Sequence, residues 1–127
     1  MEKQVICLDT NYLILGLVAG SRESRELTAW VTSGEQLVTP TLAWFEFVCG
    51  PVTPLQIQTM RAFLHEIVPF DEIHAIAAAE LFNAALRKRS TRVDAMIAAT
   101  AIVADAPLAT NNKHDFRPFV DGGLRLL

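Results

Sequence analysis

The sequence predicts an α/β fold with three layers, in which helices cover both faces of a parallel sheet of about four or five strands. The first observation behind this prediction is the alternation of short apolar runs, typical of buried strands, with longer segments of helical spacing. The second is length, because 127 residues suffice for one core of this kind. We therefore expect a single domain over residues 1–127.

Five short segments are expected as strands. The first begins at Gln4 and is continuously apolar from Val5 to Leu8. Because helical segments separate the first four strands, we expect these four to pair in parallel, and we expect the last one at an edge of the sheet. The expected strands cover residues 4–8, 36–39, 67–68, 107–110 and 124–127.

Helices are expected in the intervening segments, and several of their ends carry recognisable signals. Ser33 and Gly34 end one helix, and Pro40 stands where the next can begin. Thr53 is a suitable N-cap because Pro54 follows it at the first helical position. The expected helices cover residues 11–18, 21–32, 40–50, 53–66, 71 to about 87–89, and 93–104.

Composition limits the classes of function that the chain can have. Apolar residues make up 51% of it, but no uncharged apolar run is long enough to span a membrane, so we expect a soluble, cytoplasmic protein. Cys7 and Cys49 lack a metal-binding spacing and are expected to be small apolar side chains without a disulfide. The net charge of −3 gives no overall attraction to nucleic acid, so binding RNA would need a local basic patch or metal ions.

Three carboxylates stand alone in apolar surroundings. Asp9 ends the first expected strand, Glu46 lies within the apolar helical stretch LAWFEFVCG, and Asp94 stands at the first turn of an expected helix. The apolar stripe of that last helix begins at Ile97. Ligands of open α/β sheets bind outside the carboxyl ends of the strands, which is where Asp9 is expected to lie.

These carboxylates also have structural alternatives. Asp9 could cap the following helix, which is worth about 1 kcal/mol, and Asp94 could complement the dipole of its helix. Glu46 has no such role in the middle of a helix, and its burial without a partner would cost several kcal/mol. Since no buried basic partner is evident nearby in sequence, a divalent cation remains as the stabilising group for clustered acids. Ligands that are all oxygen favour Mg²⁺ or Mn²⁺.

Three stretches carry a resemblance to a known family. They are VICLDTNYLI, TPTLAWFEF and RVDAMIAATAIVADAPLATNNKHDF, and they follow one another across nearly the whole chain. Together they resemble the PIN-domain ribonucleases and, within that superfamily, the VapC-type toxins of toxin–antitoxin pairs. The resemblance implies a PIN-like fold, an RNA substrate, a homodimer, and a small antitoxin protein as partner.

The resemblance also implies the residues of an active site. Asp9, Glu46 and Asp94 would bind the metal and carry the catalysis, which is hydrolysis of RNA phosphodiester bonds by metal-activated water. Hydroxyl and amide side chains would support the site, and these are Thr10, Asn11 and Thr110.

The fourth acidic position departs from the family pattern. The family often has an acid two residues after the threonine of its late motif, and this chain has Asn112 there. Asp115 is therefore the candidate for the fourth catalytic and metal-binding acid, acting directly or through water, with Asn112 as a neutral oxygen donor. A turn or cap role for Asp115 is the alternative.

A basic cluster just before Asp94 allows two interpretations. Its positive charges could bind RNA phosphates beside the acids, or they could form a solvated helix end that suits the helix dipole. Both interpretations stay open. The cluster consists of Arg87, Lys88, Arg89 and Arg92.

Two hypotheses of function follow from these residues. The first is an endoribonuclease that depends on Mg²⁺ or Mn²⁺ and acts as the toxin of a type II pair. The second is a weakly active or inactive PIN-like module that works as a binding or assembly partner. The three acids favour the enzyme, and the asparagine at the fourth position leaves the second hypothesis open.

Overall fold

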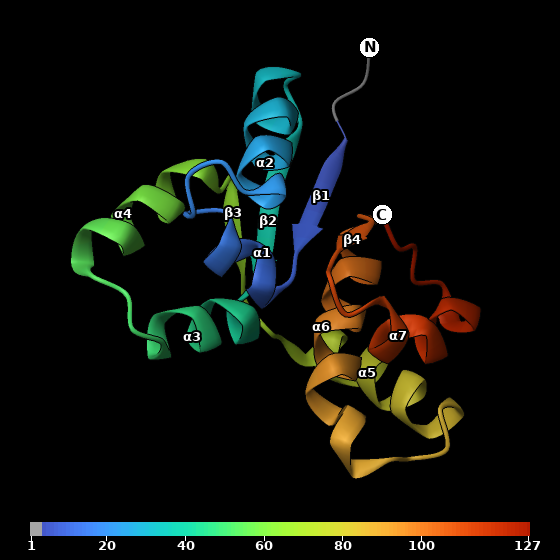
Figure 1. The fold of residues 1–127 in the computed structure, drawn as a ribbon. Coiled ribbons are helices and arrows are strands. Elements are labelled where there is room, and N and C mark those ends of the chain that lie inside the picture. The colour runs from blue at the N-terminus through green and yellow to red at the C-terminus, as the bar shows by residue number, and fades with distance from the viewer. Residues whose placement is uncertain (1–3) are drawn as a thin grey trace.

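The computed structural model describes residues 4–127, and within that range four strands form one parallel sheet. The strands are β1 (Val5–Leu8), β2 (Gln36–Pro40), β3 (Glu66–Val68) and β4 (Leu108–Ala109). Their order is β3-β2-β1-β4, which places β1 inside the sheet (Figure 1). The expected fold class is confirmed. The expected strand at 124–127 is wrong, because Leu126 makes only an isolated parallel bridge to Leu108.

Helices fill the connections between the strands. They are α1 (Thr10–Leu15), α2 (Arg22–Thr32), α3 (Thr41–Cys49), α4 (Pro54–Phe63), α5 (Glu72–Ala84), α6 (Arg92–Val103) and α7 (Lys113–Phe116). Two 3₁₀ helices, η1 (Arg89–Thr91) and η2 (Arg117–Gly122), complete the chain. No helix within the described range is both long and apolar enough to cross a bilayer.

Several helix ends differ from the expectation for tertiary reasons. α1 ends at Leu15 instead of residue 18, and the chain turns at Gly16 where α1 meets α2. A Cβ at Gly16 would lie 2.4 Å from the Leu27 side chain, so only glycine fits this contact without a shift. α4 ends at Phe63 because residues 66–68 pair with β2 instead of extending the helix. Thr53 and Gln56 form the capping box at its start, as the Thr53–Pro54 signal predicts.

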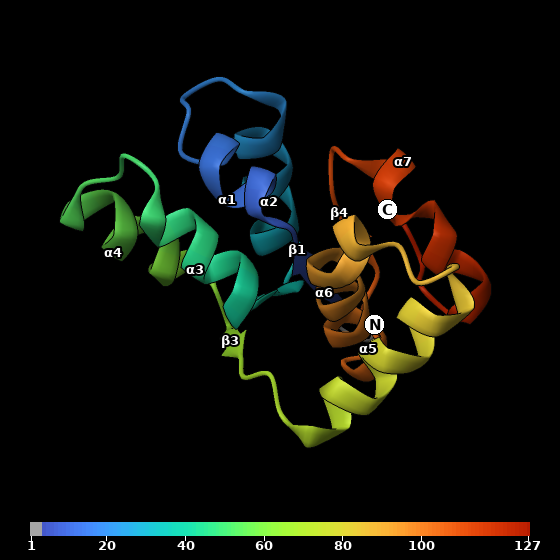
Figure 2. The ribbon, with the colours of Figure 1, turned by 90° about the horizontal axis from the view of Figure 1, so that it is seen from below.

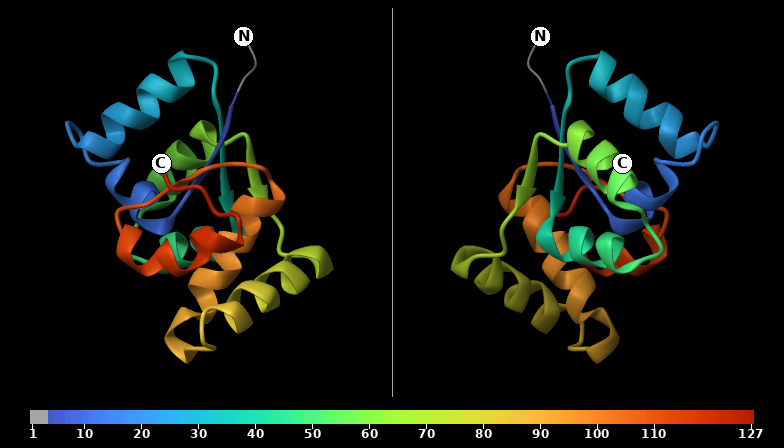
Figure 3. Two further views of the ribbon diagram at one scale, coloured as in Figure 1. Left: turned by 90° about the vertical axis from the view of Figure 1, so that its right-hand side faces the viewer. Right: turned by 90° about the vertical axis from the view of Figure 1, so that its left-hand side faces the viewer.

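The two faces of the sheet carry separate hydrophobic cores. Alternate residues of β1 point to opposite faces, so that Cys7 joins one core while Ile6 and Leu8 join the other. Helices α1–α4 cover the face of Ile6 and Leu8, and α5–α7 cover the face of Cys7 (Figures 1 and 3). This gives the three layers that the sequence predicts. Cys7 and Cys49 are both free thiols, as expected, although Cys49 is exposed and not an apolar filler.

The carboxyl end of β1 is the point where the helical layers meet. Figure 2 looks at the molecule from below and shows α1, α3 and α6 grouped around this end of the strand. Asp9 follows β1 directly, while α3 and α6 carry Glu46 and Asp94. Side chains far apart in sequence therefore gather at one edge of the sheet, as expected for a parallel α/β fold.

Candidate active site

Asp9 is held in place by a set of hydrogen bonds to both of its carboxylate oxygens. It is only 5% exposed and stands at the N-cap of α1, where the Thr10 backbone N–H donates to Oδ1 at 2.8 Å. The Thr110 hydroxyl donates to Oδ2 at 2.7 Å, and the Asn11 amide donates to the same oxygen at 3.4 Å. Thr10, Asn11 and Thr110 thus contact the acid that the sequence assigns them to support.

Burial nevertheless raises the pKa of Asp9 above its usual value. The hydrogen bonds from Thr110, Thr10 and Asn11 act in the opposite direction, because they stabilise the ionised form. The negative charge of Asp115 raises the pKa further. Asp9 is therefore firmly oriented by its neighbours while its charge remains poorly compensated.

Asp94 stands at the first turn of α6 in crowded electrostatic surroundings. It is half-buried, and its desolvation together with the charges of Asp9, Asp115 and Glu46 raises its pKa to about 6. Coulomb interactions with all three acids show that these four carboxylates lie around one region. Perturbation of this kind is common at functional sites, where like charges are brought together.

Glu46 lies at the rim of this region. The Thr10 hydroxyl donates to Glu46 Oε1 at 3.4 Å, which links α1 to α3 beside Asp9. The side chain of Glu46 is exposed, so the cost of burying it without a partner, considered from the sequence, does not arise. The solvent around α3 accommodates its charge, and its position beside Asp9 and Asp94 does not depend on a burial argument.

A cavity of about 580 Å³ joins these residues. Asp9, Glu46 and Asp94 line it together with Asn112. The rest of the lining is largely apolar, and the remaining lining residues are Thr10, Asn11, Ile14, Leu42, Phe45, Val93 and Ile97. The three acids that the sequence singled out therefore open into one common space.

Asp115 and Asn112 approach the acids from different sides. Asn112 lines the cavity of Asp9, whereas Asp115 lines a neighbouring cavity of about 530 Å³ that it shares with Asp94. Asp115 belongs to α7 and raises the pKa of both Asp9 and Asp94, so its charge acts on both. Both candidates for the fourth metal-binding position therefore lie close to the site. Of the two, only Asp115 adds a negative charge.

The donor set fits an ion such as Mg²⁺ or Mn²⁺, because carboxylate, hydroxyl and amide oxygens are what these ions prefer. Within residues 4–127, the ion pairs join Arg22 to Glu23 and Glu26, and Arg125 to Asp105; none of them includes the four clustered acids. No three acidic, His or Cys side chains in that range already converge closely enough to enclose an ion. Ionised carboxylates repel one another, so joint ligation requires their side chains to rotate inward around the cation.

A network around Asn111 was not anticipated from the sequence. The Asn111 amide donates to Glu23 Oε2 at 3.0 Å, and Arg22 donates to the Asn111 side-chain oxygen at 2.7 Å and to Glu23 Oε2 at 3.0 Å. The Asn111 backbone N–H donates to the Asn11 side-chain oxygen at 3.2 Å. The start of α2 thereby anchors the loop that carries Thr110 and Asn112. A buried Glu23, only 7% exposed, is the structural sign of this network, and nothing in its local sequence marks it.

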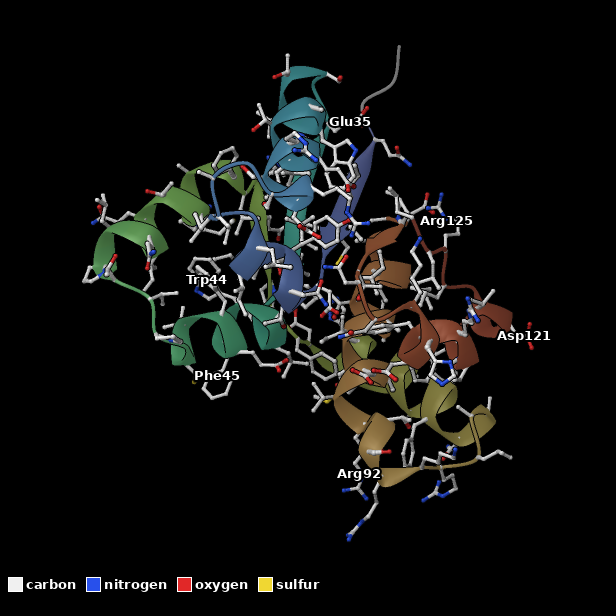
Figure 4. The ribbon with its side chains drawn as sticks, in the orientation of Figure 1. Glu35, Trp44, Phe45, Arg92, Asp121 and Arg125 are labelled. Carbon is white, nitrogen blue, oxygen red and sulfur yellow. The ribbon has the colours of Figure 1, made fainter. Side chains whose placement is uncertain are left out.

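The four residues of the basic cluster have different surroundings in the structure. The guanidinium carbons of Arg87 and Arg92 lie 5.4 Å and 5.7 Å from the centroid of the Phe82 ring, so these two arginines pack on α5. Lys88 lines the second cavity beside Asp94 and Asp115, and Arg89 is exposed in η1. Figure 4 shows Arg92 at the lower end of the molecule, where α6 begins. The four basic residues therefore lie in different surroundings, and only Lys88 among them shares a cavity with the acids.

Residues 6–119 match the PIN domain family over most of the chain. The chain belongs to the PIN domain family. This places it in a family of nucleases that includes toxins, and it confirms the resemblance seen in the three sequence motifs. No relative with a curated description matches the sequence significantly.

Solved structures similar to this PIN domain support the assignment. A toxin–antitoxin complex from Klebsiella pneumoniae contains a chain with 30% identity and a TM-score of 0.69, covering 88% of this chain and 90% of that one. VapBC2 from Rickettsia felis, bound to a DNA fragment from its promoter, aligns with a TM-score of 0.72 at 19% identity over 98% of both chains. VapBC-1 from nontypeable Haemophilus influenzae gives a TM-score of 0.70 at 18% identity over 98% of this chain and 97% of that one. The last two show the shared fold.

The charge on Asp94 should lower the stability of the metal-free PIN domain at neutral pH. The pKa of this carboxyl rises from 3.8 to about 6 on folding, so the folded state binds its proton more tightly than the unfolded chain. Protonation of Asp94 therefore stabilises the folded state. This contribution is fully present below about pH 4 and is lost as the pH rises through about 6. We expect Asp94→Asn to melt at a higher temperature than the wild type in EDTA at pH 7.5, with a difference that shrinks towards pH 4.

The matched control is Asp121→Asn, which removes an exposed charge on η2. It should leave the melting temperature almost unchanged across the same pH range. A lower melting temperature for Asp94→Asn at pH 7.5 would mean that its carboxylate stabilises the fold, contrary to this account.

Proposed function

We propose that the chain is a metal-dependent endoribonuclease that acts as the toxin of a type II toxin–antitoxin pair. The observation that carries the proposal is the crowding of Asp94 by Asp9, Glu46 and Asp115, which raises its pKa to about 6 in a PIN domain. Such a group of uncompensated acids is the arrangement expected before a divalent cation binds. Mg²⁺ or Mn²⁺ is the cofactor that the oxygen ligands favour.

The residues divide into ligands and groups that orient the ligands. Asp9, Glu46, Asp94 and Asp115 would hold the cation, which supplies a water molecule of lowered pKa and neutralises charge on the attacked phosphate. Thr110 and Asn11 fix the orientation of Asp9 through hydrogen bonds at 2.7 Å and 3.4 Å. One of these carboxylates would accept the proton of the attacking water.

Several apolar surfaces support the partners expected of such a toxin. Phe45 and Val48 on α3 and Leu55 on α4 are 65%, 40% and 70% exposed. A cavity of about 220 Å³ is lined by residues from the end of α1 and the turn after it, and by residues of the α3–α4 segment. Because the relative from Klebsiella pneumoniae is a toxin–antitoxin complex, we propose that an antitoxin segment covers this surface.

A homodimer is the second assembly that we propose. Ile73 and Ile76 lie three residues apart on α5 and are 60% and 57% exposed, which is unusual for large apolar side chains on one helix face. The pair lies on the opposite layer from the surface of α3 and α4. A second copy of the chain can therefore contact α5 without blocking the proposed antitoxin surface.

The alternative is a PIN-like module without activity. The presence of Asp9, Glu46 and Asp94 in one cavity argues against it, and Asp115 on α7 would add a fourth charge although Asn112 replaces the acid of the usual position. A module that only bound a partner would gain nothing from clustering four acids.

Metal dependence tests the proposed function directly. Mn²⁺ or Mg²⁺ should raise the melting temperature, because the ion relieves the repulsion among the acids, and EDTA should abolish cleavage of single-stranded RNA. Asp94→Asn should lower the cleavage rate by at least about 10²-fold, the scale on which losing one electrostatic element acts.

The control for this prediction is Asp121→Asn, which should cleave as the wild type does. RNA cleavage that continues undiminished in EDTA would exclude the proposed chemistry. A folded Asp94→Asn protein with wild-type activity would remove Asp94 from the site.

Substitutions at Asp115 and Asn112 can decide which of the two residues fills the fourth metal-binding position. Asp115→Ala removes a charge that acts on both Asp9 and Asp94, so we expect it to weaken Mn²⁺ binding and cleavage more than Asn112→Ala does. Asn112→Asp adds a carboxylate to the cavity of Asp9 and should preserve or increase the affinity for Mn²⁺. Titration with Mn²⁺ measures both effects. If Asp115→Ala binds like the wild type while Asn112→Ala fails, Asn112 fills the position.

A further inference from the structure

The second cavity beside the acids differs in character from the first. Apolar residues make up about half of the lining of the first cavity, whereas six of the ten residues that line the second are polar or charged. Besides Asp94 and Asp115, these are Lys88, His114 and two hydroxyl residues, and the apolar part is Ala84, Ala85, Leu86 and Pro118. The hydroxyl residues are Ser90 and Thr91. Asp94 lines both cavities, so the second cavity adjoins the acids that are proposed to bind the metal.

Lys88 is distinguished from the other basic residues by its position. Arg87 and Arg92 pack on the ring of Phe82, and Arg87 also donates to the side chain of Asn83. Arg89 lines neither of the two cavities that contain Asp94. Lys88 is therefore the member of the cluster that the fold places next to the acids.

The backbone around Lys88 is held in an unusual conformation. The chain leaves α5 through Leu86 and Arg87, which have φ values of 64° and 57°. Such left-handed residues without glycine are uncommon, and they persist where the surrounding structure requires them. The Lys88 carbonyl then accepts hydrogen bonds from the Thr91 backbone N–H at 2.9 Å and from its hydroxyl at 2.6 Å. This turn holds the backbone of Lys88, whose exposed side chain lines the cavity.

Lys88 shares a cavity with Asp94 and Asp115 but forms no ion pair with either of them. The ion pairs of residues 4–127 involve Arg22 and Arg125, and none joins Lys88 to Asp94 or Asp115. A lysine beside a carboxylate cluster can instead attract a polyanion that the acids alone would repel. This matters in a chain of net charge −3, which has no general attraction to RNA.

We propose that Lys88, assisted by Ser90 and His114, forms a subsite for a phosphate of RNA next to the phosphate that is cleaved. The inference rests on the proposed nuclease function. It also assigns roles within the basic cluster, with Lys88 contacting substrate and Arg87 and Arg92 stabilising the α5–α6 connection through Phe82. RNA therefore enters the acid cluster from the side of α7 and η1.

Binding of a fluorescent single-stranded RNA, measured by anisotropy in EDTA, tests the subsite while the RNA stays intact. Lys88→Gln should weaken binding and reduce the slope of log Kd against log salt by about 0.7, the value for one phosphate contact on a single strand. Arg89→Gln is the matched control, because it removes the same charge one residue away and should retain the wild-type slope. Lys88→Arg keeps the charge and should restore most of the affinity.

Cleavage kinetics with Mn²⁺ provide the second measurement. Lys88→Gln should raise KM several-fold while kcat stays close to that of the wild type, because the phosphate held by Lys88 does not react. Melting temperatures of the three variants identify any loss of folding. We expect none for Lys88→Gln, because the substitution keeps the backbone carbonyl that accepts both hydrogen bonds from Thr91.

These experiments distinguish a failure of the proposed nuclease function from a failure of the proposed phosphate subsite. If the wild type does not cleave RNA with Mn²⁺, the proposed function fails, and the anisotropy measurement still decides on the subsite. If the wild type cleaves but Lys88→Gln and Arg89→Gln behave alike in salt slope and KM, the subsite at Lys88 is overturned and the nuclease function stands.

Discussion

Repulsion among carboxylates at the carboxyl edge of the sheet is the constraint on which the rest of this structure depends. The parallel topology brings Asp9, Asp94 and Glu46 to one cavity from β1, α6 and α3, and α7 adds Asp115. Burial and mutual repulsion raise the pKa values of Asp9 and Asp94, and no ion pair among the described residues relieves them. A fold maintains such an arrangement only when the surrounding scaffold is stable enough to hold it.

The scaffold meets this constraint with neutral hydrogen-bond donors instead of cations. Thr110 and Asn11 bond Asp9, and Asn111 connects their loop to Glu23 and Arg22 at the start of α2. Neutral donors orient a carboxylate without cancelling its charge, so the acid stays available to a divalent cation. Over residues 4–127, the basic side chains are placed where they do not form ion pairs with the cluster.

Sequence reasoning predicted the features that are encoded locally. Continuous apolar runs predicted the four strands, and the isolated position of Asp9 after the first of them predicted its place at the edge of the sheet. The end of α1 at Leu15 was not predicted, and the close packing of Gly16 on Leu27 of α2 is a tertiary contact that the local pattern does not show. The exposure of Glu46 was also missed, since the apolar neighbours on α3 face partly outward.

Other features that the sequence did not predict depend on contacts between residues far apart in the chain. Asn111 meets Glu23 across 88 positions, and neither residue has a local pattern that marks the pair. The division of the basic cluster depends on the left-handed turn at Leu86 and Arg87, which sequence periodicity does not reveal. The four residues of α7 are too few for a helical pattern, so Asp115 was a candidate only through the family resemblance, and the helix that carries it was not predicted.

The most direct test of the central claim is a crystal structure of the chain soaked in Mn²⁺, with anomalous scattering recorded to locate the ion. We expect an anomalous peak between Asp9 and Asp94, with the two carboxylates rotated towards it and with Asp115 or Asn112 completing the shell. The absence of a peak at a Mn²⁺ concentration that supports RNA cleavage, or a peak that contacts neither Asp9 nor Asp94, would contradict the claim.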